Sequence, residues 1–235
     1  MNRTVSNIPN AITCLNIASG VMAVIAAFGV DSPMWGLPAY QWAFIFIGIA
    51  AVADFMDGLA ARTLHAYSEL GKELDSLCDL VSFGVAPAMI IYNCLDTLSP
   101  DPWVKWVAVV IPVLGALRLA KFNIDTRQTT SFIGLPIPAN AIFWIGYAAL
   151  CYGGAETAYH WWCALPVILF ISWMMVSPVK LFSLKFKNLK WKGNQFRWLL
   201  IVTAIVMVAC MGVAGLMWLI VAYILYGLFD AGKTA

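Results

Sequence analysis

The sequence predicts an all-α integral membrane protein, a bundle of about eight transmembrane helices whose termini both face the cytoplasm. Three observations lead to this fold class: the composition, the lengths of the apolar runs and the positions of the charges. Of the 235 residues, 62% are hydrophobic and 11% are charged, whereas soluble proteins average about 45–50% and about 25%. The mean hydropathy is +0.83. Such a chain has too little polar surface to cover a water-soluble globule, so we expect it to lie in a bilayer.

The apolar runs have the length of membrane-spanning helices. A span needs about 20 apolar residues, and runs of roughly that size are separated by proline, glycine or charge. A last apolar run, 198–229, is longer than a bilayer is thick, and Gly212 and Gly215 offer a turn inside it. The helices are therefore predicted at roughly 11–30, 40–62, 75–95, 103–122, 137–153, 159–179, 196–212 and 214–230.

The charges support an even number of helices. With the N-terminus inside, every basic residue except Lys105 falls on the cytoplasmic side, as the positive-inside rule requires. The opposite loops carry acidic residues, namely Asp31, Asp96, Asp101 and Glu156. The net charge of only +2 provides no strongly basic surface for nucleic acid. No composition shift marks a second domain, so the chain is expected to form one transmembrane domain over 1–235.

Four carboxylates interrupt the second and third predicted spans: Asp54, Asp57, Asp75 and Asp79. A carboxylate at membrane depth costs a few kcal/mol, so each needs a partner or a polar cavity. Within each span the two acids share one helix face, and the two faces can oppose each other. Four carboxylates around one cavity repel unless cations neutralise them, and their oxygens suit hard ions such as Mg²⁺ or Mn²⁺. The sequence therefore predicts a site for one or two divalent ions.

Small residues and an arginine lie between the acidic pairs. Gly58, Ala61 and Gly71 would let a ligand approach the backbone closely, and Arg62 could bind a phosphate. A phosphate-bearing substrate fits this pattern. Two alternatives remain open: the small residues could simply pack helices together, and the acids could form ion pairs with Arg62 and Lys72 at the membrane surface.

Written out, Asp54-x2-Asp57-Gly58-x2-Ala61-Arg62-x8-Gly71-x3-Asp75-x3-Asp79 resembles the signature of the CDP-alcohol phosphotransferase (phosphatidyltransferase) family. Further stretches resemble the integral-membrane phosphatidylserine synthase branch of that family. They are IPNAITCLN (8–16), LDSLCDLVSFGVAPA (74–88), RLAKFN (118–123) and FIGLPIPANA (132–141). These matches cover about the first 140 residues, whereas the last 95 or so match only as hydrophobic helices.

The resemblance implies a homodimeric membrane enzyme that displaces CMP from CDP-diacylglycerol with L-serine, forming phosphatidylserine. It implies a catalytic core at about 1–180 followed by two last helices over 196–230. Asp54, Asp57 and Asp75 are similar to the ligands of one divalent ion, Mg²⁺ or Mn²⁺, and Asp75 and Asp79 to those of a second. Asp79 is also similar to the general base of the family. The resemblance places the cytidine diphosphate against Asp54, Gly58, Ala61, Arg62 and Gly71.

A serine acceptor would need a cation for its carboxylate. Arg118 and Lys121 lie one turn apart at the end of the fourth predicted span, with Asn123 just beyond them. Arg118 is equally well explained as a cytoplasmic topology marker, and for Lys121 that explanation is favoured. Ser82 shares a helix face with Asp75 and Asp79 and is a further pocket candidate.

Other assignments stay open at this point. The same chemistry could use glycerol 3-phosphate or an inositol phosphate as acceptor, and the four aspartates could instead serve a divalent-cation transporter. Asn10 or Thr13 could cap the first helix or contact a ligand, and capping is the expected role. We expect a multi-pass protein of a prokaryotic inner membrane with its active site toward the cytoplasm, in contact with membrane lipids and not with nucleic acid.

Overall fold

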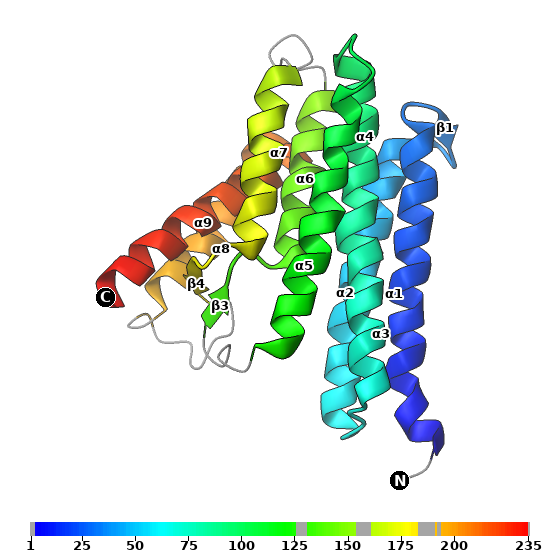
Figure 1. Ribbon diagram of the computed structural model, residues 1–235, viewed down its shortest axis with the longest axis vertical. Helices are drawn as coiled ribbons and strands as arrows, with labels where there is room; N and C mark the ends of the chain where they lie inside the picture. The colour runs from blue at the N-terminus through cyan, green and yellow to red at the C-terminus, as the bar shows by residue number, and fades with distance from the viewer. Residues whose placement is uncertain (1–2, 126–130, 154–160, 183–190, 192–193, 235) are drawn as a thin grey trace.

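The computed structural model describes residues 3–125, 131–153, 161–182, 191 and 194–234, and these are helical apart from loops and four short strands. Figure 1 shows the long helices side by side in one bundle. The predicted all-helical fold class is confirmed. The helices are α1 (Arg3–Gly29), α2 (Ala39–Thr63), α3 (Glu69–Asp79), α4 (Ala86–Leu98), α5 (Val110–Ile124), α6 (Ile137–Tyr152), α7 (Trp161–Val176), α8 (Gln195–Met211) and α9 (Gly215–Thr234).

Short turns of other helical types join some of these helices. A π-helical turn, η1 (Leu80–Val85), links α3 to α4, so that the chain stays helical from Glu69 to Leu98. A 3₁₀ segment, η2 (Val104–Val109), leads directly into α5. The strands form two antiparallel pairs: β1 (Pro33–Met34) with β2 (Leu37–Pro38), and β3 (Ser131–Ile133) with β4 (Lys180–Phe182).

The expected number of spans was wrong. Among the described residues, five segments are long and apolar enough to cross a membrane, and two shorter apolar helices, α6 and α7, bring the total to seven rather than eight. The difference lies at the C-terminal end, where Gln195–Asp230 is a single continuous apolar segment. The five long segments are Asn7–Gly29, Ala39–Thr63, Glu69–Leu98, Val104–Ile124 and Gln195–Asp230.

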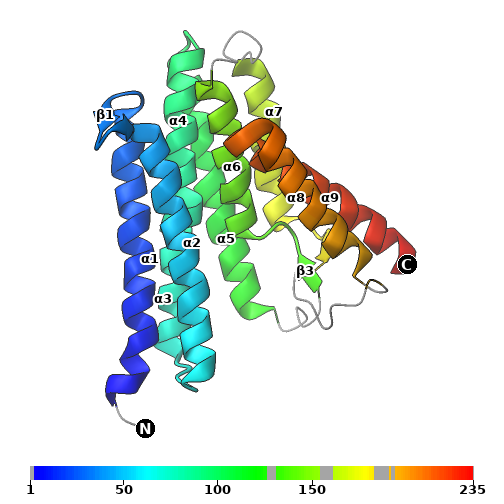
Figure 2. The same ribbon diagram turned by 180° about the vertical axis from the view of Figure 1, so that it is seen from behind.

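The last apolar segment nevertheless reverses direction at the predicted turn. Gly212 adopts φ +59, in the left-handed region that glycine tolerates, and a 3₁₀ turn, η3 (Gly212–Ala214), connects α8 to α9. The hydroxyls of Thr203 and Tyr226 are 3.1 Å apart across the two helices. We call α8, η3 and α9 the C-terminal hairpin. Figure 2 shows it lying obliquely against the rest of the bundle.

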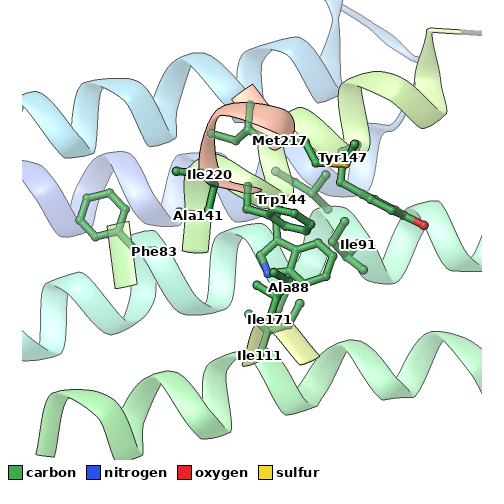
Figure 3. Packing of buried hydrophobic residues seen from close by; sticks show 14 of the residues in the cluster. Phe83, Ala88, Ile91, Ile111, Ala141, Trp144, Tyr147, Ile171, Met217 and Ile220 are labelled. Carbon is green, nitrogen blue, oxygen red and sulfur yellow. The ribbon is translucent and has the colours of Figure 1, made fainter. Parts of the chain in front are cut away.

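The core centres on α6. The Trp144 side chain is completely buried, and Figure 3 shows it among side chains of α4, α5 and α7. Its indole N–H donates to the Asn140 side-chain oxygen at 2.8 Å, so this polar group is satisfied inside the core. Elsewhere large apolar side chains such as Phe55 and Phe229 are exposed, as lipid-facing positions of a membrane protein would be.

The two ends of the bundle differ in character. The start of α1 and the connection between α2 and α3 lie at the bottom of Figure 1, and α5 also ends toward this side. The β1–β2 pair lies at the opposite end. All four aspartates of the motif lie in α2 and α3 toward the first of these ends.

Candidate active site

A short connection brings the acidic parts of α2 and α3 together. Ser68 caps α3 by accepting a hydrogen bond from the Gly71 N–H at 2.9 Å. Ala66, one residue after the end of the turn at His65, is buried and fixes the connection against the bundle. After this tight return, one turn and a half of α3 is enough to carry Asp75 to the level of the acids on α2.

Three carboxylates converge at this point. Ligand oxygens of Asp54, Asp57 and Asp75 all lie within 4.8 Å of one another. Asp79 lies outside this group, one turn farther along α3, and its side chain is buried. We call Asp54, Asp57 and Asp75 the acidic cluster. The structure thus joins the two motif halves through three of their four aspartates.

Helix α1 supplies the hydrogen-bond donors to this site. The Thr13 hydroxyl lies 2.6 Å from Asp57 Oδ2 and donates to it, and also lies 3.0 Å from the Pro9 carbonyl. The Asn16 amide donates to Asp79 Oδ1 at 3.2 Å. Since α1 begins at Arg3, the prediction that Asn10 or Thr13 caps this helix was wrong, and both residues instead line the pocket described below. Thr13 instead holds a carboxylate of the neighbouring helix.

Close packing of α1 against η1 fixes where the Thr13 and Asn16 donors lie along the bundle. A Cβ on Gly20 would overlap the side chain of Ser82, so only glycine allows this approach. The Ser82 hydroxyl donates to the Asn16 carbonyl at 3.0 Å. Ser82 therefore ties η1 to α1 beside the residue that contacts Asp79, and its oxygen is buried in that contact.

No basic side chain neutralises the acids within the described part of the chain. Lys72 donates to the Asn123 carbonyl at 3.1 Å, and Arg62 is exposed and forms no ion pair with any described residue. The described residues therefore form no ion pair between the motif aspartates and Arg62 or Lys72. Asp75 Oδ1 is buried and accepts no hydrogen bond from a described residue. Three converging carboxylates with a buried oxygen left over match the ligands that hard divalent cations prefer.

A pocket of about 220 Å³ opens beside the acidic cluster. Gly58, Ala61 and Gly71 line it, whereas Arg62 and Asp54 are not among its lining residues. A Cβ on Gly58 would meet no atom within 4 Å, so Gly58 does not serve helix packing within this chain. Its lack of a side chain leaves room in the pocket. The other lining residues are Pro9, Asn10, Thr13, Asp57, Ala66, Tyr67, Ser68, Lys72 and Asp75.

The four acceptor candidates do not form one group. Arg118 is buried, and its Nε–H donates to the Leu135 carbonyl at 3.4 Å. Lys121 is exposed and its ammonium lies 3.4 Å from the Val176 carbonyl. The Asn123 amide donates to the Ser76 hydroxyl at 3.0 Å, which links α5 to α3. Of the four, only Arg118 places a cation in the interior.

The geometry of the site can be compared with known proteins. Residues 6–179 match the family model of CDP-alcohol phosphatidyltransferase. The chain belongs to this family. The aspartate motif in α2 and α3 is therefore the signature of this family. The multi-helix membrane fold agrees with this membership.

Several curated relatives are named CDP-diacylglycerol–serine O-phosphatidyltransferase. The protein of Bacillus subtilis (strain 168) is 41% identical over 144 residues, covering 58% of this chain and 71% of the relative. That of Helicobacter pylori (strain 26695) is 31% identical over 208 residues, covering 85% and 81%. That of Mycobacterium leprae is 38% identical over 151 residues, covering 61% of this chain and 47% of the relative.

The contacts of two residues with the aspartates escaped the sequence analysis. Thr13 and Asn16 donate to Asp57 and Asp79, yet neither belongs to the aspartate motif. A signal was present, because Thr13, Asn16 and Gly20 follow the i, i+3, i+7 spacing of one helix face. Polar or small residues repeated on one face of a membrane helix indicate a face turned toward other helices.

Proposed function

We propose that this protein transfers the phosphatidyl group from CDP-diacylglycerol to L-serine, giving phosphatidylserine and CMP. The observation that carries the proposal is the acidic cluster, which has no described basic partner and borders a pocket lined by glycines. Membership in the CDP-alcohol phosphatidyltransferase family supports the reaction type. The shared name of the relatives supports serine as the acceptor.

The acidic cluster would hold the divalent metal of the reaction. Asp54, Asp57 and Asp75 are the proposed ligands of one ion, and Asp75 and Asp79 of a second, with Mg²⁺ or Mn²⁺ as the candidates. Such ions neutralise charge on a diphosphate and stabilise its leaving oxygen. The hydrogen bond from Thr13 fixes the Asp57 carboxylate, and this restricts the geometry that the ligand set presents.

The transfer itself needs a base for the serine hydroxyl. We assign this role to Asp79, whose carboxylate is oriented by the Asn16 amide at 3.2 Å. The hydroxyl proton passes to Asp79 as the serine oxygen forms a bond to the lipid-side phosphorus. The bond from that phosphorus to the bridging oxygen breaks, and CMP leaves with the electron pair. Burial of Asp79 excludes water as a competing acceptor.

The pocket is the proposed location of the cytidine diphosphate. Gly58, Ala61 and Gly71 line it directly, and Gly58 leaves the space that a ligand would fill. Asp54 and Arg62 are the remaining proposed contacts. Arg62 is exposed at the last turn of α2, from which its long side chain can reach a phosphate at the pocket mouth.

Arg118 is the proposed partner of the serine carboxylate. The contacts between α3, η1 and α5 place it at the level of Asp79. Asn123 meets Ser76 at 3.0 Å, and a Cβ on Gly115 would lie 3.8 Å from the Leu80 side chain. Arg118 lies between these two α5 positions. Lys121, Asn123 and Ser82 remain proposed as outer parts of the same acceptor pocket, although each contacts a neighbouring helix.

The setting of the enzyme is also a proposal. We infer a single domain over 1–235, with a catalytic core at about 1–180 and the helices at 196–230 as an addition to it. The protein would be a homodimer of the inner membrane with both termini and the active site toward the cytoplasm. In support, the start of α1 and the connection between α2 and α3, which joins the two acid-bearing helices, lie at the same end of the bundle in Figure 1.

The decisive test is CMP release by detergent-purified protein supplied with CDP-diacylglycerol and Mg²⁺ or Mn²⁺. L-serine, glycerol 3-phosphate and an inositol phosphate are offered in turn. We expect release with serine alone, its loss with a chelator, and a fall of about 10²–10⁴-fold in Asp79→Asn. Release with another acceptor would overturn the serine assignment, near-normal turnover of Asp79→Asn would remove the base assignment, and metal flux without CMP release would indicate a transporter.

A further inference from the structure

The pocket beside the acidic cluster has a buried end and an exposed end. Thr13 and Asp57 line its buried end and are only 3% and 5% exposed. Tyr67 lines its other end and is 71% exposed. This exposed end belongs to the connection between α2 and α3, at the bottom of Figure 1 and outside the segments that can span a membrane. The pocket therefore runs from the acidic cluster to the surface of the membrane domain.

This direction decides how a nucleotide would lie in the pocket. The inference rests on the proposed function, in which the pocket takes the cytidine diphosphate. The phosphates belong at the buried end, because the carboxylates that would hold their metal are there. The acyl chains of the substrate stay in the bilayer, whereas the nucleoside is polar and extends toward water. The residues of the exposed end are then the ones that meet the base.

The connection between α2 and α3 holds Tyr67 in place at this end. His65 adopts φ +50 in the turn, and the buried Ala66 donates its N–H to the last turn of α2 at 3.0 Å. On the other side, Ser68 caps α3 by accepting from the Gly71 N–H at 2.9 Å. Tyr67 thus lies between two anchored neighbours. Its ring contacts no other aromatic ring among the described residues, so a face is left for a ligand.

A second wall of the exposed end belongs to α1. Asn10 lines the pocket one helical turn before Thr13, and its Oδ1 lies 3.0 Å from the position of a Cβ added to Gly71. The Asn10 side-chain amide forms no hydrogen bond with a described residue. An amide has both donors and an acceptor, and the edge of a cytosine likewise offers an amino donor and acceptor atoms. Asn10 can therefore bind the edge of a base and leave its faces to another group.

We propose that Tyr67 stacks on the pyrimidine base of the nucleotide and that Asn10 hydrogen-bonds the edge of that base. Stacking suits the position, because every base has a flat face that an aromatic ring can cover. Tyr67 lies in the eight-residue spacer between Arg62 and Gly71, outside the fixed positions of the aspartate motif. The connection between α2 and α3 is then a binding element of its own and does more than join two helices.

The test compares CMP with ribose 5-phosphate, which has a phosphate and a sugar but no base. Both affinities are measured by thermal-shift titration of the full-length protein in detergent with Mn²⁺. Tyr67→Leu should weaken CMP binding about tenfold, as for the loss of one stacked base, and should leave ribose 5-phosphate unaffected. Tyr67→Phe keeps the aromatic face and should keep the wild-type affinity. Asn10→Leu should weaken the binding of CMP alone, by about three- to tenfold.

The control is Trp103→Leu, which removes an exposed aromatic residue at the opposite end of the bundle and should change neither affinity. Wild-type CMP affinity in Tyr67→Leu would make Tyr67 an interfacial anchor and overturn the inference. Equal losses for CMP and ribose 5-phosphate, or an equal loss of CMP affinity in Tyr67→Phe, would also overturn it. A wild type that neither binds CMP nor releases it from CDP-diacylglycerol would instead overturn the proposed function, so the two failures are distinguishable.

Discussion

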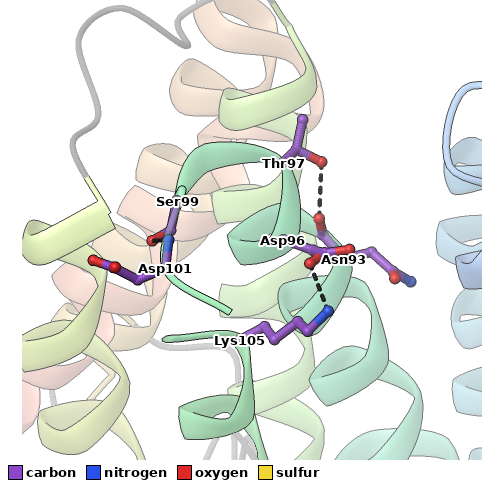
Figure 4. A network of polar contacts seen from close by, with 6 residues as sticks. All are labelled: Asn93, Asp96, Thr97, Ser99, Asp101 and Lys105. Carbon is purple, nitrogen blue, oxygen red and sulfur yellow. Dashed lines mark hydrogen bonds and ion pairs between the residues drawn. The ribbon is translucent and has the colours of Figure 1, made fainter. Parts of the chain in front are cut away.

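The two ends of the bundle both carry acidic side chains, but these acids are partnered in opposite ways. At the end with the β1–β2 pair, Lys105 forms an ion pair with Asp96 at 2.7 Å, and Figure 4 shows this pair beside Asn93 and Thr97. The Thr97 hydroxyl donates to the Asn93 carbonyl, one turn back, at 2.9 Å. The acid Asp96 thus has a cation nine residues away in sequence as its partner, whereas the Asn93 amide donates to the Ala27 carbonyl of α1 at 2.8 Å.

At the end with the acidic cluster, the partners come from another helix and none is a cation among the described residues. Asp57 and Asp79 accept hydrogen bonds from Thr13 and Asn16 on α1. Gathering carboxylates without cations costs stability, because they repel one another and lose water. An arrangement that costs stability is retained for function, whereas the ion pair of Asp96 and Lys105 needs no explanation beyond local charge compensation.

The largest effect that this comparison predicts follows from removing one carboxylate of the acidic cluster. Asp75→Asn should lower CMP release by about 10³-fold or more, since it removes charge from the groups that neutralise the diphosphate. It should at the same time keep or raise the melting temperature of the metal-free protein, because repulsion is relieved. Added Mn²⁺ should stabilise the wild type and not the variant, as a thermal-shift titration would show.

The control for this change is Asp101→Asn, an exposed acid at the opposite end. It should preserve both CMP release and the stabilisation by Mn²⁺. The comparison would fail if Asp75→Asn kept more than about a tenth of the activity, or if it lost stability without metal. Either result would make the acidic cluster a structural feature.

The acidic cluster was largely predictable from sequence and its partners were not. Asp54 with Asp57, and Asp75 with Asp79, share helix faces through spacing alone, and the connection between α2 and α3 is too short to separate them. Which face of α1 meets them depends on tertiary packing, such as the contact allowed by Gly20.

The predicted number of spans was wrong for a different physical reason. Hydropathy measures how apolar a run is, and the run ending in α9 is apolar throughout. A turn inside such a run leaves only a conformational signal, the glycine at φ +59. The sequence therefore predicted where the chain turns, but it predicted eight membrane spans where the structure has seven apolar segments.

A smaller effect is expected from the hydrogen bond between α1 and the acidic cluster. Thr13→Val keeps the shape of the side chain and removes the donor to Asp57 Oδ2. Such supporting contacts contribute about 10–100-fold to metal affinity, so we expect the Mn²⁺ concentration for half-maximal CMP release to rise by about tenfold. Thr97→Val, which removes a hydroxyl at the opposite end, is the control. An unchanged Mn²⁺ dependence in Thr13→Val would exclude α1 from the site.

The smallest effect is expected at the ion pair itself. Lys105→Met removes the partner of Asp96 and the contact with the Tyr92 ring, but both charged groups are partly exposed to solvent. Exposed ion pairs contribute little because water and salt screen them. CMP release and its Mn²⁺ dependence should match the wild type, and the melting temperatures should agree at low and at high salt. A rise in the Mn²⁺ requirement as large as that of Thr13→Val would show that the two ends are coupled through α4, η1 and α3, since these form the continuous helix that joins Asp96 to Asp79.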